Sequence, residues 1–149
     1  MKTEVPIDDG RCFACGPENE IGLHLHFERS GDDGVHARTT LRPEFQGWRG
    51  IAHGGVALAL LDEAMAHAAG AAGHRGVTAS MNARFRKPIP LGVPIDIEGR
   101  VKWTRRNVLE LRAFVADESG AVLVEAEGRF VSQGRIEDIA DRRNPNVSR

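Results

Sequence analysis

Residues 53–69 read HGGVALALLDEAMAHAA. From Val56 to Ala69 nearly every side chain is small or apolar on every side of a predicted helix, and Asp62 and Glu63 interrupt the pattern. A helix that is apolar all round is typical of a buried position, whereas a surface helix carries one apolar stripe. Two acids halfway along a buried helix are unfavourable unless they are paired with other groups or take part in the function of the protein. The stretch predicts a buried helix from about residue 54 to about residue 69, with candidate functional acids at its middle.

Strand-like segments lie on both sides of this helix. Leu23, Leu25 and Phe27 alternate with polar residues, and together with residues 35–41 they predict a hairpin around a turn at 31–34. After the helix, alternation predicts strands at 77–86, 95–103, 108–117 and 122–131. The last three are joined by connections short enough for antiparallel neighbours. We expect an α+β fold in which an antiparallel sheet curls around the helix, and a partner subunit covers the rest of the helix.

The chain has 149 residues, which is most simply one domain. We expect an irregular lead-in at residues 1–20, the folded domain at 21–132, and a polar, mobile tail at 133–149. The N-terminus lacks the apolar run of a signal peptide, and the helical stretch is too short and too acidic to span a bilayer. The formal net charge of -1 gives no global attraction to nucleic acid. These features predict a cytoplasmic protein that binds neither membrane nor nucleic acid.

Three motifs carry a resemblance to a known family. They are His53-Gly54-Gly55 with an acid nine positions on at Asp62, MNARFRKP at 81–88, and CFACGP at 12–17. They resemble the hotdog-fold thioesterases, in particular 4-hydroxybenzoyl-CoA and phenylacetate-pathway acyl-CoA thioesterases, over roughly residues 12–132. The resemblance implies a hotdog fold, an antiparallel sheet wrapped around one long central helix. It also implies hydrolysis of an acyl-CoA to a carboxylic acid and coenzyme A by a homodimer or homotetramer, without a metal or organic cofactor.

The nine-residue spacing from His53 to Asp62 has a geometric consequence of its own. Along a helix it corresponds to about 13.5 Å of rise and about half a turn beyond two full turns. The helix start and Asp62 are therefore expected to be far apart and on opposite faces. If both are catalytic, the site must be shared, with each protomer giving its helix start to the acid of the other.

The helix start and the acids have candidate roles in thioester hydrolysis. The first backbone N–H groups of a helix lack intrahelical partners, so the Gly55 (or Gly54) N–H is a candidate donor to the thioester oxygen. The alternative for these glycines is a tight turn into the helix. Asp62 is the candidate general base or nucleophile, and its alternative is a structural or solvated carboxylate. Glu63 is the second candidate acid, and Thr78 either orients the attacking water, as the resemblance implies, or is an ordinary strand residue.

Further residues are candidates for binding the substrate. His53 either contacts the thioester or orients the helix start, and Gln46 lies near, although one residue out of register with, a family position occupied by Asn or Gln. Asn82 belongs to the resembling motif. Basic side chains that could bind the phosphates of coenzyme A follow on the same strand and after it, at Arg84, Arg86 and Lys87. Arg49 and the pair Arg105-Arg106 are further possibilities, and the alternative for each cation is a solvated surface charge.

The two cysteines leave a metal site as an alternative. Cys12 and Cys15 with His24 and His26 would make a Cys₂His₂ set for zinc. Their spacing is not that of a zinc finger, and a free thiol pair packing the lead-in is the main expectation. Two alternative functions also stay open at this point: a non-catalytic acyl-CoA binding protein, and a hotdog dehydratase or hydratase acting on hydroxyacyl thioesters.

Overall fold

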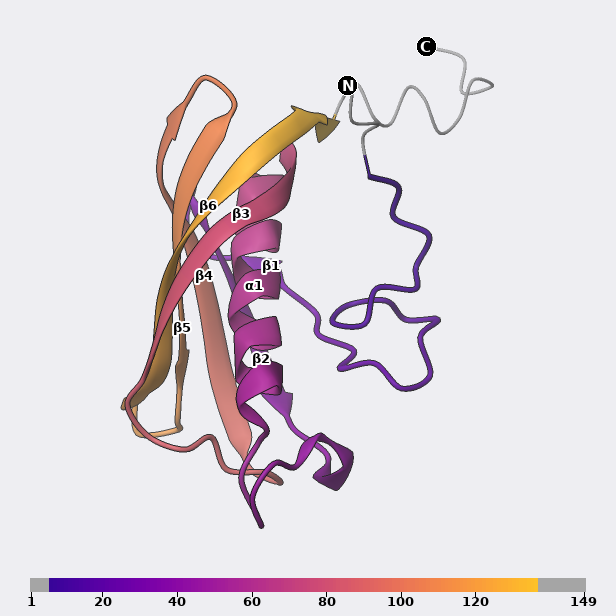
Figure 1. The fold of residues 1–149 in the computed structure, drawn as a ribbon, viewed down its shortest axis with the longest axis vertical. Coiled ribbons are helices and arrows are strands. Elements are labelled where there is room, and N and C mark those ends of the chain that lie inside the picture. The colour runs from indigo at the N-terminus through magenta and orange to yellow at the C-terminus, as the bar shows by residue number, and fades with distance from the viewer. Residues whose placement is uncertain (1–5, 137–149) are drawn as a thin grey trace.

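The computed structural model describes residues 6–136, which form one long helix against a six-stranded antiparallel sheet (Figure 1). In chain order the elements are β1 (Glu28–Arg29), β2 (Gly34–Thr40), the 3₁₀ helix η1 (Pro43–Phe45), α1 (Gly54–Ala71), β3 (His74–Phe85), β4 (Pro94–Arg105), β5 (Val108–Ala116) and β6 (Val122–Arg135). The strands are arranged in the order β1-β2-β4-β5-β6-β3. The predicted sheet around a central helix is confirmed.

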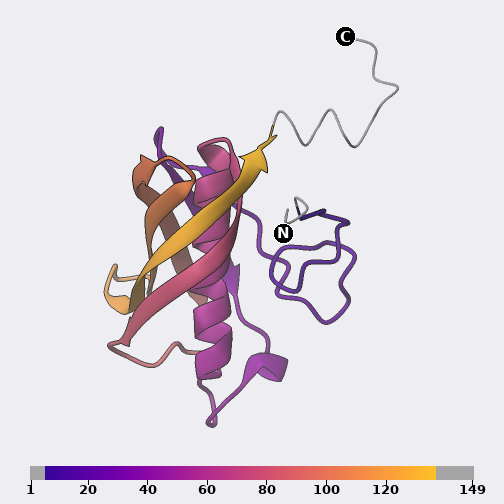
Figure 2. The same cartoon turned by 45° about the horizontal axis from the view of Figure 1, so that its top comes forward.

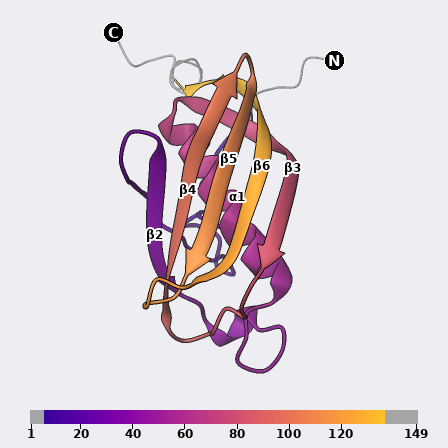
Figure 3. The same cartoon turned by 90° about the vertical axis from the view of Figure 1, so that its left-hand side faces the viewer.

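The core lies between α1 and one face of the sheet, which Figure 3 shows from its other side. The helix buries seven side chains there: Ala57, Leu60, Leu61, Ala64, Met65, Ala68 and Ala69. The helix is not buried on every side, however. In the single chain the Leu58 side chain is 38% exposed, and Asp62 and Glu63 are half-buried. Sheet and lead-in thus leave part of the helix surface uncovered within one chain, and its cover by a partner subunit stays a prediction.

Small residues let α1 approach the sheet closely. A Cβ placed at Gly99 of β4 would lie 2.3 Å from the Ala64 carbonyl oxygen, and one at Gly128 of β6 would lie 2.9 Å from the Met65 sulfur. A side chain at Gly99 would collide with the Ala64 backbone, whereas one at Gly128 would have to displace the buried end of Met65. The two glycines therefore set the depth at which the helix sits on the sheet.

The lead-in lies on the other side of α1 from the sheet, so the helix is held between two layers (Figures 1 and 2). Its described part, residues 6–20, contains no helix or strand. The predicted strand at 23–28 is wrong except at its last residue, because only Glu28–Arg29 pair with β2. The N–H groups of Leu23 and Leu25 instead donate to carbonyl oxygens of the lead-in at 2.8 Å, and His24 has a positive φ of 52° that an extended strand does not allow. Both leucines are buried, as their alternation indicated.

Two element boundaries also differ from the prediction. Strand β3 begins at His74, three residues before the predicted start at 77, and β6 continues to Arg135. Residues 133–135 are thus strand and not tail, because they pair with the early residues of β3. The rest of the predicted tail, residues 137–149, lies outside the described residues.

Strand β3 forms one edge of the sheet (Figure 3). It is 12 residues long, pairs with β6 on one side, and has no strand on its other side in the part of the chain that the structure describes. A long exposed edge strand offers a row of backbone donors and acceptors to another chain. Within residues 6–136 no helix is both long and apolar enough to cross a membrane.

Candidate active site

The middle of α1 and the strand β3 together present a hydrogen-bonded pair of polar side chains. The Thr78 hydroxyl donates to Oδ1 of Asp62 at 2.6 Å. Thr78 is exposed and Asp62 is half-buried, so both are accessible from solvent. The pairing of β3 with β6 shifts register between Thr78 and Ser80. The structure thus brings together two of the predicted site residues, and we call this pair the acid half-site.

Exposed apolar side chains lie on the elements that carry the acid half-site. Leu58, one turn before Asp62 on α1, is 38% exposed, and Val77, beside Thr78, is 44% exposed. Phe85 at the end of β3 is 57% exposed. Exposed apolar side chains along a free strand edge and the helix beside it are typical of a surface that another molecule covers.

The start of α1 forms a second site, which we call the helix-start half-site. His53 is the N-cap residue, and its ring atom Nδ1 accepts the Gly55 N–H at 2.9 Å. The predicted donor Gly55 is therefore already engaged by the His53 side chain. Among the hydrogen bonds within residues 6–136, none uses the Gly54 N–H. Gly54 is exposed, and the nearest neighbour of a Cβ built there is the Phe85 ring at 3.9 Å.

The loop before the helix holds His53 in place. A Cβ at Gly47 would lie 2.9 Å from the His53 Cα, so only glycine allows the loop to approach the helix start this closely. The Gln46 side-chain oxygen accepts the Gly50 N–H at 3.0 Å. In the single chain Gln46 therefore closes its own loop. Its predicted contact with substrate stays a prediction.

The two half-sites lie apart along the helix axis, but they do not lie on opposite faces of the helix as predicted. From Gly55 to Asp62 is seven residues, which corresponds to about 10.5 Å of rise and nearly two full turns. Gly55 and Asp62 thus lie on nearly the same face of the helix. Only His53, nine residues before Asp62, is on the opposite face. The axial distance still keeps the two half-sites of one chain apart.

Glu63 points away from the acid half-site and toward the lead-in. Its carboxylate oxygens lie 3.7 and 3.8 Å from the Cys12 thiol, and Oε1 lies 3.0 Å from Nε2 of His67. Burial raises the pKa of Glu63, but hydrogen bonds from His67, Cys15 and Cys12 outweigh it and hold the pKa below its usual value. Burial and the neighbouring Glu63 raise the pKa of the Cys15 thiol far above its usual value. Glu63 is thus bound to the lead-in through Cys12, whereas its i,i+4 spacing indicates only the contact with His67 on the same helix.

The other residues predicted to bind the substrate lie away from both half-sites of the same chain. Asn82 and Arg84 line a cavity of about 550 Å³ on the sheet face opposite α1. Arg86 pairs there with Glu125 at 2.6 Å, and Lys87 lies beside Asp117 in the loop after β3. These four residues are not brought together with Asp62 of the same chain. Their role in binding coenzyme A stays a prediction.

The histidines of the predicted zinc set do not join the cysteines. His24 and His26 are exposed, and the His24 ring bonds to the Asn19 carbonyl oxygen. They alternate with the buried Leu23 and Leu25, so their side chains face away from the core. The Cys₂His₂ set is therefore wrong. Glu63, and neither histidine, lies beside Cys12 and Cys15.

Comparison with known proteins gives a consistent family assignment. The family model of the thioesterase superfamily matches residues 49–124. A solved thioesterase superfamily protein is 30% identical over 82% of this chain, with a TM-score of 0.78, and this chain covers 63% of the length of that protein. No curated protein matches the sequence significantly.

Two more distant structures share the fold. A hypothetical thioesterase protein from Streptococcus pneumoniae, solved with coenzyme A, is 21% identical over 74% of this chain and 90% of its own, with a TM-score of 0.70. Aspartate-to-alanine and threonine-to-alanine variants of that protein have also been solved. The E. coli PaaI protein from the phenylacetic acid degradation operon is 16% identical over 76% of this chain and 82% of its own, with a TM-score of 0.70.

Proposed function

Because the chain belongs to the thioesterase superfamily, we propose that it is an acyl-CoA thioesterase, which hydrolyses a thioester to a carboxylic acid and free coenzyme A. The observation that carries the proposal is the 2.6 Å hydrogen bond from Thr78 to Asp62 on an accessible surface. The two alanine variants of the S. pneumoniae protein support it. Their aspartate and threonine are the same number of residues apart as Asp62 and Thr78.

In the proposed reaction Asp62 acts as the general base. Thr78 holds Oδ1, which leaves Oδ2 of Asp62 to accept a proton from a water molecule. The water oxygen attacks the thioester carbonyl carbon, and the resulting oxyanion is stabilised by helix-start N–H groups. The C–S bond then breaks, and the proton passes from Asp62 to the departing thiolate, which gives the free thiol of coenzyme A. No residue in this scheme requires a metal or an organic cofactor.

The site is proposed to be shared by two protomers. A base acting through one water and a donor to the same carbonyl lie within roughly 6 Å of each other. The rise of about 10.5 Å between Gly55 and Asp62 exceeds this distance. A second copy can supply the missing half if its β3 pairs antiparallel with β3 of the first, because a two-fold axis there sets the two helices antiparallel. The start of one helix then lies beside the middle of the other.

The Gly54 N–H is the proposed first donor at the helix start, because its hydrogen is not used within the described chain. The Gly55 N–H can contribute once the His53 ring releases it. Replacing Gly54 by proline tests this directly. Proline is favoured at the first helical position, and His53 already has the extended backbone (ψ 139°) that precedes proline. Gly54→Pro thus removes one N–H and keeps the helix, and we expect kcat to fall roughly 100- to 1000-fold.

The proposed activity is tested by release of free coenzyme A from short, medium and aromatic acyl-CoAs. Asp62→Asn is the matched variant, since it keeps shape and removes the base, and we expect a loss of roughly 100- to 10,000-fold. Equal activity in wild type and Asp62→Asn would remove Asp62 from the mechanism. Tight binding without release would show an acyl-CoA binding protein, and hydration of an enoyl-CoA without release would show a hydratase.

A further inference from the structure

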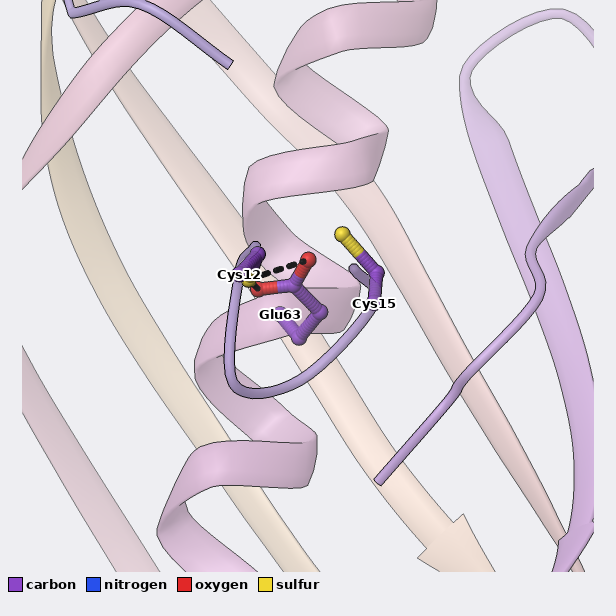
Figure 4. A group of neighbouring side chains, drawn as sticks. All are labelled: Cys12, Cys15 and Glu63. Carbon is purple, nitrogen blue, oxygen red and sulfur yellow. Dashed lines mark hydrogen bonds between the residues drawn. The ribbon is translucent and has the colours of Figure 1, made fainter. Parts of the chain in front are cut away.

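The lead-in carries both cysteines of the chain on one tight turn beside α1 (Figure 4). The turn is closed by the Gly16 N–H, which donates to the Cys12 carbonyl oxygen at 2.8 Å. A Cβ at Gly16 would lie 2.4 Å from the Cys12 backbone nitrogen, so the turn requires glycine at this position. The Ala14 N–H points at the Cys12 sulfur at 3.4 Å. This contact fixes the direction of the Cys12 sulfur on the side of the turn that faces Glu63.

Glu63 of α1 faces this turn and completes a cluster of three ligand atoms. The sulfurs of Cys12 and Cys15 and a Glu63 carboxylate oxygen all lie within 4.8 Å of one another, and the carboxylate is 3.7 Å from the Cys12 sulfur. A tetrahedral zinc ion with ordinary bond lengths separates a sulfur ligand from an oxygen ligand by about 3.5 Å and two sulfurs by about 3.8 Å. The three atoms therefore need only small side-chain shifts to surround a zinc ion.

His67 gives the carboxylate a fixed orientation. Its Nε2 lies 3.0 Å from Glu63 Oε1, and its ring stacks on Phe27 with centroids 4.7 Å apart. The Glu63 side chain is only 13% exposed, so its direction is restricted from several sides. Carboxylates that bind metals are commonly held by such outer hydrogen bonds.

We propose that Cys12, Cys15 and Glu63 bind a zinc ion that fastens the lead-in to α1. His67 orients the carboxylate, and water from the adjoining open cavity of about 730 Å³ takes the fourth position. On binding, the two thiols lose their protons to solvent as the Zn–S bonds form. Two thiolates select zinc over magnesium or calcium, which prefer oxygen ligands. Glu63 is turned about 100° around the helix from Asp62, so the zinc is structural and takes no part in thioester hydrolysis.

The test begins with protein purified in reducing buffer without chelator and analysed for metal by mass spectrometry. We expect about one zinc per chain in the wild type. We expect none in Cys12→Ser/Cys15→Ser, and a zinc affinity lower by about tenfold or more in Glu63→Gln. His24→Ala/His26→Ala is the control and keeps its zinc. Cobalt substitution adds a spectroscopic readout, because tetrahedral thiolate coordination gives sulfur-to-cobalt charge-transfer bands that the serine variant lacks.

Removing the metal from the wild type tests the structural role without any substitution. Chelation is expected to speed proteolytic cleavage within the lead-in and to leave α1 and the sheet protected. Four results would overturn the proposal. They are failure of the reduced wild type to take up zinc, a Cys12–Cys15 disulfide that re-forms in the presence of zinc, zinc retained by the serine variant, and zinc lost by the histidine variant.

Discussion

Replacing Thr78 by valine removes the hydroxyl that bonds to Asp62 and keeps the shape and the β-branching of the side chain. A hydrogen bond to a charged group contributes about 1.5–3 kcal/mol. Because Thr78 is exposed, water replaces part of this interaction, so the lower end of the range applies. A loss of about 1.5 kcal/mol in the transition state lowers kcat about tenfold. We therefore expect Thr78→Val to hydrolyse acyl-CoA about tenfold more slowly, with KM changed little.

The matched control is Thr78→Ser, which restores the hydroxyl on a smaller side chain. It is expected to recover most of kcat, and the free energy of unfolding should be alike in both variants. The assay is steady-state release of coenzyme A from the best substrate of the panel. Two results would refute the reasoning: wild-type kcat in Thr78→Val, or the same loss in the serine and the valine variants.

Three further predictions test the interface, the sheet and a titrating side chain. Val77→Lys on β3 is expected to give an inactive monomer in sedimentation velocity, whereas Val93→Lys, which is about equally exposed, is expected to stay dimeric and active. Gly99→Ala is expected to lower the free energy of unfolding in urea by about 3 kcal/mol, because its Cβ would meet the Ala64 carbonyl oxygen, and a loss below about 0.5 kcal/mol would contradict the packing. Burial and the nearby Arg135 lower the pKa of His74. Folding therefore favours the neutral form of His74. This contribution to stability is fully present above the pKa of His74 in the unfolded chain, about 6.5, and it is lost as the pH falls through the lower pKa of the folded protein. The free energy of unfolding should rise more between about pH 5.5 and about pH 7.5 in the wild type than in His74→Asn. An equal rise in both proteins would show that His74 does not contribute to the pH dependence of stability.

Much of the fold follows from local sequence signals. The helix was predicted at 54–69 and is observed at Gly54–Ala71, because glycines mark both of its ends. The four strands after it were found from their alternation. The alternation at 23–28 predicted a strand wrongly, because it reflects packing against the lead-in. The positive φ of His24 has no sequence signature. The place of β3 at the sheet edge beyond β6 also has no local signal, because periodicity shows which faces are buried and not which strands are neighbours.

The site was predictable in part. Asp62 and Thr78, which the family resemblance assigned to one site, are in contact, and their catalytic roles stay a prediction. The His53 cap on Gly55 depends on a ring orientation that spacing does not determine. The contact of Glu63 with Cys12 joins residues 51 positions apart, and nothing in the sequence pairs them. The position of Asn82 and Arg84 was readable, since they alternate with the core-packed Met81 and Ala83 and so face away from α1.

Complementation between two inactive variants tests whether Asp62 of one protomer works with the helix start of the other. Asp62→Asn and Gly54→Pro homodimers are each nearly inactive on this account. When the two variants are mixed and allowed to exchange subunits, half of the dimers are mixed, and each mixed dimer contains one site with an intact Asp62 and an intact helix start. With a shared site, activity is expected to recover to about one quarter of the wild-type value. Confirmed subunit exchange without any recovery would show that both groups act within one chain, and would contradict the shared site.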